Sequence, residues 1–103
     1  MNYTVTTGDM SFEWDVDKAS LNESKHGVSF IEAHSVFLDV DAKLIADPDH
    51  SASEDRFILL GISFETRLIL VCHCYRGDGD VVRIISARLA TRGESQNYMT
   101  GVH

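Results

Sequence analysis

Long apolar runs, proline and cysteine are scarce in this chain of 103 residues, and each shortage excludes a class of protein. No uninterrupted apolar stretch approaches the roughly 18 residues that a membrane span requires. A single proline and an apolar fraction of 44% argue against a disordered or fibrous chain. The segment Met1–Thr4 lacks the basic and apolar regions of a signal peptide, so a cytoplasmic protein with no membrane partner is expected.

Two cysteines are too few for a disulfide framework. Cys72 and Cys74 lie two residues apart in an apolar run, so in a strand they share a face and are poorly placed for a bond. We expect reduced, buried thiols. His73 points to the opposite face of such a strand, so these three residues do not converge on a metal. No metal or cofactor is expected.

Acidic residues outnumber basic ones by 16 to 9, and the net charge is −7. This balance argues against indiscriminate binding of nucleic acid, which depends on neutralising phosphates. The charge is unevenly placed, because residues 76–92 hold four arginines and two acids, a net charge of +2, while the rest carries −9. A local basic site on an acidic body suits one specific phosphate-bearing ligand and a second, basic partner.

The first predicted helix covers residues 16–26. Asp15 is a typical N-cap, and Gly27 fits the position just after the last helical residue. Lys25 and His26 fall in the last turn, where the helix dipole favours positive charge. Helix capping and a functional role therefore both remain open for this pair.

Two capping boxes predict further helices. Ser29 and Glu32 open a helix to about Leu38, which forms a helical hairpin with the first one. Thr91 and Glu94 open a short C-terminal helix, and in this role Glu94 is a cap rather than a catalytic base. The second helix offers Glu32 and no arginine or lysine to DNA bases, which disfavours a DNA-reading helix-turn-helix.

Strand patterns cover most of the remaining chain. An edge strand is expected at residues 12–14 and a short strand at residues 44–46. Segments 56–64, 67–75 and 81–89 are joined by short connections, so we expect antiparallel neighbours. The acids and histidine of residues 47–54 (Asp47, Asp49, His50 and Glu54) match no metal-site spacing and are interpreted as a loop. Residues 1–11 are expected to be a flexible extension, and residues 12–103 a single domain.

The last strand carries the basic cluster. Arg83, Arg88 and Arg92 follow one another with no acidic residue between them. In a regular strand Arg83 and Arg88 point to opposite faces. A bulge or a strand end near Ser86 would re-aim one of them.

Motifs along residues 12–98 together resemble the BrnT toxin family. The N-terminal matches are Phe12-Glu13-Trp14-Asp15, Lys18, Asn22, Lys25-His26-Gly27-Val28-Ser29-Phe30, Glu32, Ala33, Val36, Phe37 and Asp39. The later matches are Asp47, His50, Glu54, Arg56-Phe57, Gly61, Arg76-Gly77-Asp78, Arg83-Ile84-Ile85-Ser86-Ala87-Arg88, Ala90-Thr91-Arg92, Glu94 and Tyr98. Each piece alone is weak, but their order and combination are specific.

This resemblance implies a RelE-like α+β fold, with an N-terminal helical hairpin packed on a twisted antiparallel sheet and a short C-terminal helix. It implies a toxin of a type II toxin–antitoxin system that acts as a metal-independent endoribonuclease. It further implies neutralisation by a cognate antitoxin, which has its own DNA-binding region. The toxin would then contact operator DNA only indirectly, through the antitoxin.

The resemblance and the chemistry of RNA cleavage together suggest site residues. Arginine matches phosphate oxygens with its planar fork, so Arg83 and Arg88 are expected to clamp the scissile phosphate, with Arg76 or Arg92 assisting in RNA binding. Attack by the neighbouring 2′-hydroxyl needs a base, and the leaving 5′-oxygen needs an acid.

Lys25 and His26 are the acid and base candidates, and Tyr98 would stack on a base or orient the phosphate. One departure from the family opens a second hypothesis, because residues 93–97 carry no positive charge. The alternative is a non-catalytic module that binds the antitoxin within an operon-repressing complex.

Overall fold

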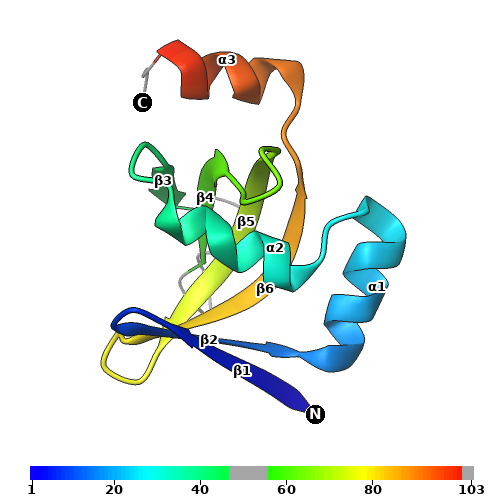
Figure 1. The fold of residues 1–103 in the computed structure, drawn as a ribbon, viewed down its shortest axis with the longest axis vertical. Helices are drawn as coiled ribbons and strands as arrows, with labels where there is room; N and C mark the ends of the chain where they lie inside the picture. Colours follow the sequence, from blue (N-terminus) through cyan, green and yellow to red (C-terminus); the bar gives the residue numbers. More distant parts are fainter. Residues whose placement is uncertain (47–55, 101–103) are drawn as a thin grey trace.

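A computed structural model describes residues 1–46 and 56–100, so the loop expected around Asp47–Glu54 lies outside the described residues. Figure 1 labels the elements along the chain. They are β1 (Asn2–Thr7), β2 (Met10–Asp15), α1 (Val16–His26), α2 (Phe30–Ser35), the 3-10 turn η1 (Val36–Leu38), β3 (Lys43–Ala46), β4 (Phe57–Ile62), β5 (Leu68–Arg76), β6 (Val81–Leu89) and α3 (Arg92–Thr100). Among these helices, none is long and apolar enough to cross a membrane.

The strands form one mixed sheet in the order β1-β2-β6-β5-β4-β3. Neighbouring strands are antiparallel except β2 and β6, which run parallel. The expected N-terminal helical hairpin on an antiparallel sheet is therefore wrong, because two strands precede α1 and one pairing is parallel. The molecule is still α+β.

The N-terminal segment forms a hairpin with β2. Residues 1–11, expected to be a flexible extension, include all of β1 and the start of β2. Gly8 adopts a positive φ of 63° in the turn between the strands. Tyr3 stacks on Trp14 with ring centroids 5.1 Å apart. This cross-strand aromatic pair stabilises β1 although most of its side chains are exposed.

Helix α1 has the ends that the sequence predicts. The Asp15 carboxylate accepts a hydrogen bond from the backbone amide of Lys18 at 2.9 Å. Gly27 adopts the left-handed conformation, and its amide donates to the carbonyl of Glu23 at 2.9 Å. The predicted span of residues 16–26 is confirmed.

The second helix is shorter than predicted. Ser29 caps α2 by accepting a hydrogen bond from the Glu32 amide at 3.0 Å. The Glu32 side chain does not complete the capping box, because its carboxylate accepts hydrogen bonds from Ser63 at 2.6 Å and from Arg67 Nε at 2.9 Å. These bonds tie α2 to the turn between β4 and β5, while the last predicted residues of the helix form η1.

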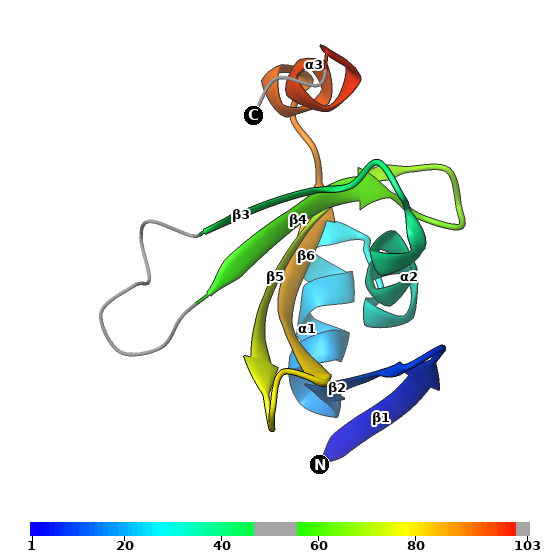
Figure 2. The same cartoon turned by 90° about the vertical axis from the view of Figure 1, so that its left-hand side faces the viewer.

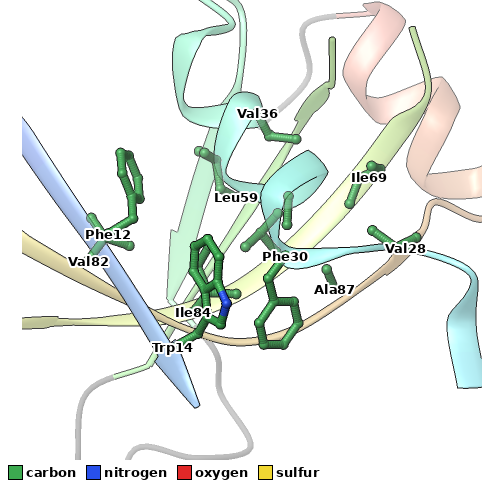
Figure 3. Packing of buried hydrophobic residues seen from close by; sticks show 12 residues of the cluster. Phe12, Trp14, Val28, Phe30, Val36, Leu59, Ile69, Val82, Ile84 and Ala87 are labelled. Carbon is green, nitrogen blue, oxygen red and sulfur yellow. The ribbon is translucent and has the colours of Figure 1, made fainter. Parts of the chain in front are cut away.

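Helices α1 and α2 cover one face of the sheet, and α3 stands apart beyond the end of β6 (Figure 2). Between α2 and the sheet, Phe12, Trp14 and Phe30 form part of a cluster of buried apolar residues (Figure 3). His73 is fully buried on this side. Cys72 and Cys74 form no disulfide with each other; Cys74 is buried as expected, whereas Cys72 is half-buried. The opposite face of β4, β5 and β6 carries no helix in Figure 2, and we call it the open face.

Candidate active site

A β-bulge interrupts β6 in the middle of the basic segment. Cys72 of β5 pairs with Ser86, but the next residue, His73, pairs with Ile84. Ile85 is therefore an extra residue on β6. Of the two alternatives that the sequence left open near Ser86, a bulge and a strand end, the structure has the bulge.

The bulge changes which side chains share a face. Ile84 and Ala87 are both buried in the core, although a regular strand would place them on opposite faces. Arg83 precedes the first of these residues and Arg88 follows the second. Both arginines therefore project from the open face, which strict alternation would not allow.

Asn22 holds α1 against the edge of β6 that lies beyond its short pairing with β2. Strand β2 pairs only with residues 81–83 of β6. Farther along, the buried Asn22 side chain donates to the carbonyl of Ala87 at 2.9 Å and accepts from its amide at 3.1 Å. Asn22 also donates to the carbonyl of Val28 at 3.0 Å. The Asn22 side chain thus satisfies the backbone amide and carbonyl of Ala87, which a further strand would otherwise have paired.

This contact places His26 beside the basic segment. His26 lies one helical turn after Asn22, so the two side chains share a face of α1. A cleft of about 350 Å³ opens there on the open face, and its polar lining consists of His26, Arg56, Ser86 and Arg88. Ile58, Leu70 and Ile85 line its apolar part. We refer to this hollow as the cleft.

Arg88 is oriented by α3. Its two terminal nitrogens each donate to one carboxylate oxygen of Glu94 at 2.9 Å. Glu94 also accepts from the Thr91 amide at 2.8 Å, while Thr91 Oγ1 accepts from the Glu94 amide at 3.3 Å, so the predicted capping box is confirmed. The hydrogen bonds from Arg88 lower the pKa of Glu94 to about 2. Such a weak base is unsuited to take a proton at neutral pH.

Arg83 and Arg76 lie around a different acid on the open face. Arg83 Nη1 is 2.6 Å from Glu13 Oε2, and Arg76 Nε is 3.9 Å from the same oxygen. Arg83 also donates to the side chain of Asn2 at 3.4 Å. Two guanidinium groups thus lie around one carboxylate.

The other predicted site residues are dispersed. Lys25 and Arg92 are exposed at the end of α1 and the start of α3. Tyr98 lines a second cavity, where its hydroxyl donates to Asp39 Oδ2 at 2.6 Å. That hydrogen bond raises the pKa of Tyr98 to about 12. The structure therefore brings His26 and Arg88 into the cleft but places Tyr98 in the other cavity.

Sequence reasoning did not assign Arg56 or Asn22 a part in the site. Arg56 lines the cleft from the segment just before β4. Asn22 is the buried residue of α1, a helix otherwise exposed or half-buried. An asparagine on the inward face of an amphipathic helix was the available signal, since buried amides are hydrogen-bonded. Within residues 1–46 and 56–100, we find no group of three His, Cys, Asp or Glu side chains placed to hold a metal ion.

Comparison with known proteins adds a family and a fold. A family model described as a ribonuclease toxin, BrnT, of a type II toxin–antitoxin system matches residues 14–94. The crystal structure of the Brucella abortus ribonuclease toxin BrnT is similar, with a TM-score of 0.58 and 23% identity. The match covers 77% of this chain and 94% of that chain. No curated protein matches the sequence. The family match contains His26 and Arg88 but ends before Tyr98.

Proposed function

The chain belongs to the BrnT family of ribonuclease toxins of type II toxin–antitoxin systems, and from this premise we propose that it cleaves RNA in the cleft without a metal ion. The observation that carries this proposal is that one cleft holds an imidazole, a hydroxyl and two guanidinium groups (His26, Ser86, Arg56 and Arg88). Its endoribonuclease activity would inhibit translation and growth until the antitoxin neutralises it.

The cleavage step uses the substrate's own 2′-hydroxyl. His26 takes the proton of this hydroxyl as the general base, because an imidazole ring nitrogen can accept a proton whereas the guanidinium groups in the cleft cannot. The 2′-oxygen then bonds to phosphorus, and the bond from phosphorus to the 5′-oxygen breaks. Water in the open cleft protonates the departing oxygen, and the hydroxide left behind takes the proton from His26, which restores the imidazole. The products are a 2′,3′-cyclic phosphate and a free 5′-hydroxyl.

Positive charge stabilises the transition state of this step. Arg88 and Arg56 face the cleft, where guanidinium groups can donate paired hydrogen bonds to the phosphate oxygens as their charge grows. Glu94 holds the Arg88 guanidinium in a fixed plane, so the side chain is oriented before RNA arrives. Lys25 adds positive charge at the end of α1.

Neighbouring phosphates bind along the open face. Arg83 and Arg76 lie farther along the same face, beside Glu13. Arg92, exposed at the start of α3, is placed beyond the other end of β6. These residues bind the RNA backbone without reading its bases. Tyr98 would contact RNA only after leaving Asp39.

Cleavage of a defined RNA in EDTA tests the proposal. We expect fragments that end in 2′,3′-cyclic phosphate, and a loss of about 100-fold or more in rate for Arg88→Ala and for His26→Gln. Lys18→Ala is the matched control, because it removes an exposed positive charge of α1 outside the cleft. Circular dichroism would confirm that each variant is folded.

One observation favours a second candidate function. The Arg88 guanidinium is already engaged by both oxygens of Glu94, so a phosphate must compete with a carboxylate for it. A protein that binds the antitoxin and represses its operon, without cleaving RNA, is consistent with this pairing. In such a complex, the antitoxin alone would contact operator DNA. Intact RNA after incubation with the folded protein, with and without ribosomes, would select this candidate.

A further inference from the structure

A second hollow, of about 430 Å³, has no described lining residue in common with the cleft. Its lining residues come from the end of α2, η1, the end of β4 with the turn after it, and α3, elements that Figure 1 labels or shows. We refer to it as the groove. Its lining includes Leu38, Asp39, Asp41, Ile62, Phe64 and Tyr98.

Large apolar side chains at the groove remain in contact with water. The exposed fractions are 62% for Leu38, 60% for Phe64 and 40% for Ile62. Leu38 comes from η1, whereas Ile62 and Phe64 come from the end of β4 and the turn after it, so the fold brings together two distant segments of the chain. Exposed apolar side chains that cluster in this way mark binding surfaces more often than scattered ones do.

Hydrogen bonds hold the walls of the groove in place. The Phe64 amide donates to Ser35 Oγ at 3.0 Å, which joins the turn after β4 to α2. Asp39 Oδ2 accepts from the Ile62 amide at 2.8 Å and from the Tyr98 hydroxyl. A groove that is already formed loses little conformational entropy when a partner enters it.

The charge around the groove limits what enters it. Asp39 and Asp41 line it, and the exposed Glu65 follows Phe64 directly. These three acids outnumber Lys43, the cation that lies near Asp39. These carboxylates repel RNA phosphates. They also oppose a symmetric contact between two copies of this chain, which would bring the same acids face to face. A segment that combines apolar side chains with lysine or arginine is complementary in both respects.

We propose that the groove is the docking site for an apolar, basic segment of the antitoxin. This proposal rests on the proposed function for the existence of the partner. The proposal adds where on the toxin the antitoxin binds and what kind of segment binds there. Phe64 and Leu38 supply the apolar contacts, and Asp41 pairs with a basic side chain of the antitoxin.

Calorimetric titration with the antitoxin encoded with this toxin tests the proposal. We expect Phe64→Ser to weaken binding by about tenfold or more, as substitution of a buried interface aromatic does. Asp41→Lys should weaken binding and also reduce its dependence on salt concentration. Leu21→Ser is the matched control, because Leu21 is 70% exposed on α1, outside the groove. It should change the dissociation constant by less than about twofold.

Two readouts separate this proposal from the nuclease proposal. Phe64→Ser should cleave RNA at the wild-type rate, since Phe64 lies outside the cleft. If the wild-type protein does not cleave RNA, the nuclease proposal is rejected. The comparison of antitoxin affinity between the wild-type protein and the groove variants still tests the docking site. Wild-type affinity in both groove variants, or no antitoxin binding by the wild-type protein, would overturn the docking site. Self-association of the toxin that Phe64→Ser abolishes would also overturn it, in favour of a second copy.

Discussion

Replacing Asn22 with alanine should destabilise the protein more than any surface substitution. The change removes three buried hydrogen bonds, at 2.9, 3.0 and 3.1 Å, and leaves the amide and carbonyl of Ala87 without their partner. Each unsatisfied buried group costs roughly 1–3 kcal/mol, and part of that cost is relieved where water enters. We therefore expect a loss of about 3 kcal/mol in the free energy of unfolding.

Thermal and urea denaturation measure this loss. For a domain of this size, about 3 kcal/mol corresponds to a melting temperature lower by roughly 12–24 °C. Asn97→Ala is the control, because this exposed asparagine of α3 should change stability by less than about 0.5 kcal/mol. Asn22→Asp keeps an acceptor for the Ala87 amide, but it places a carboxylate against the carbonyl oxygens of Val28 and Ala87. It should therefore be at least as destabilising as Asn22→Ala.

Asn22→Ala should also reduce RNA cleavage at temperatures where the variant is folded. Without the contact to Ala87, the end of α1 is no longer fixed and His26 loses its place in the cleft. A loss of stability below about 1 kcal/mol for Asn22→Ala would refute the reasoning about the strand edge. A folded variant that cleaves RNA at the wild-type rate would refute the link from Asn22 to the cleft.

Three further predictions concern the buried groups of the fold. Glu32→Gln should lower the free energy of unfolding by about 2 kcal/mol, measured by urea denaturation at pH 7. This loss is smaller than that expected from breaking a fully buried ion pair, because the Arg67 side chain is 38% exposed. Hydrogen bonds from Arg67 lower the pKa of Glu32 below 4.5, so this contribution is present above pH 4.5 and is lost as the pH falls further. Gly61→Ala should cost about 1–3 kcal/mol in the same assay, because an added Cβ would lie 2.8 Å from Val36 Cγ1. Burial lowers the pKa of His73 below 6.5, so the unfolded chain binds the proton more readily and stability should fall below about pH 6.5. His73→Gln should flatten that pH dependence of the melting temperature, and an unchanged slope would contradict it.

The sequence alone determined much of the local structure, because the signals lie within a few residues of what they control. Asp15 and Gly27 delimit α1 as predicted, and Thr91 with Glu94 opens α3. The short connections between β4, β5 and β6 make these strands antiparallel neighbours. Combined motifs also identified the family, since their order along the chain is specific.

Only the tertiary structure decided how the sheet begins and which arginines act together. The parallel pairing of β2 with β6 joins segments about 70 residues apart, and its stability comes from packing that no local pattern encodes. The bulge at Ile85 turns Arg83 and Arg88 to one face, but their partners Glu13 and Glu94 hold them at separate places. His26 reaches the cleft because a buried amide on its own helix pairs with the backbone of a distant strand. Such contacts depend on three-dimensional distance, and spacing in the sequence does not reveal them.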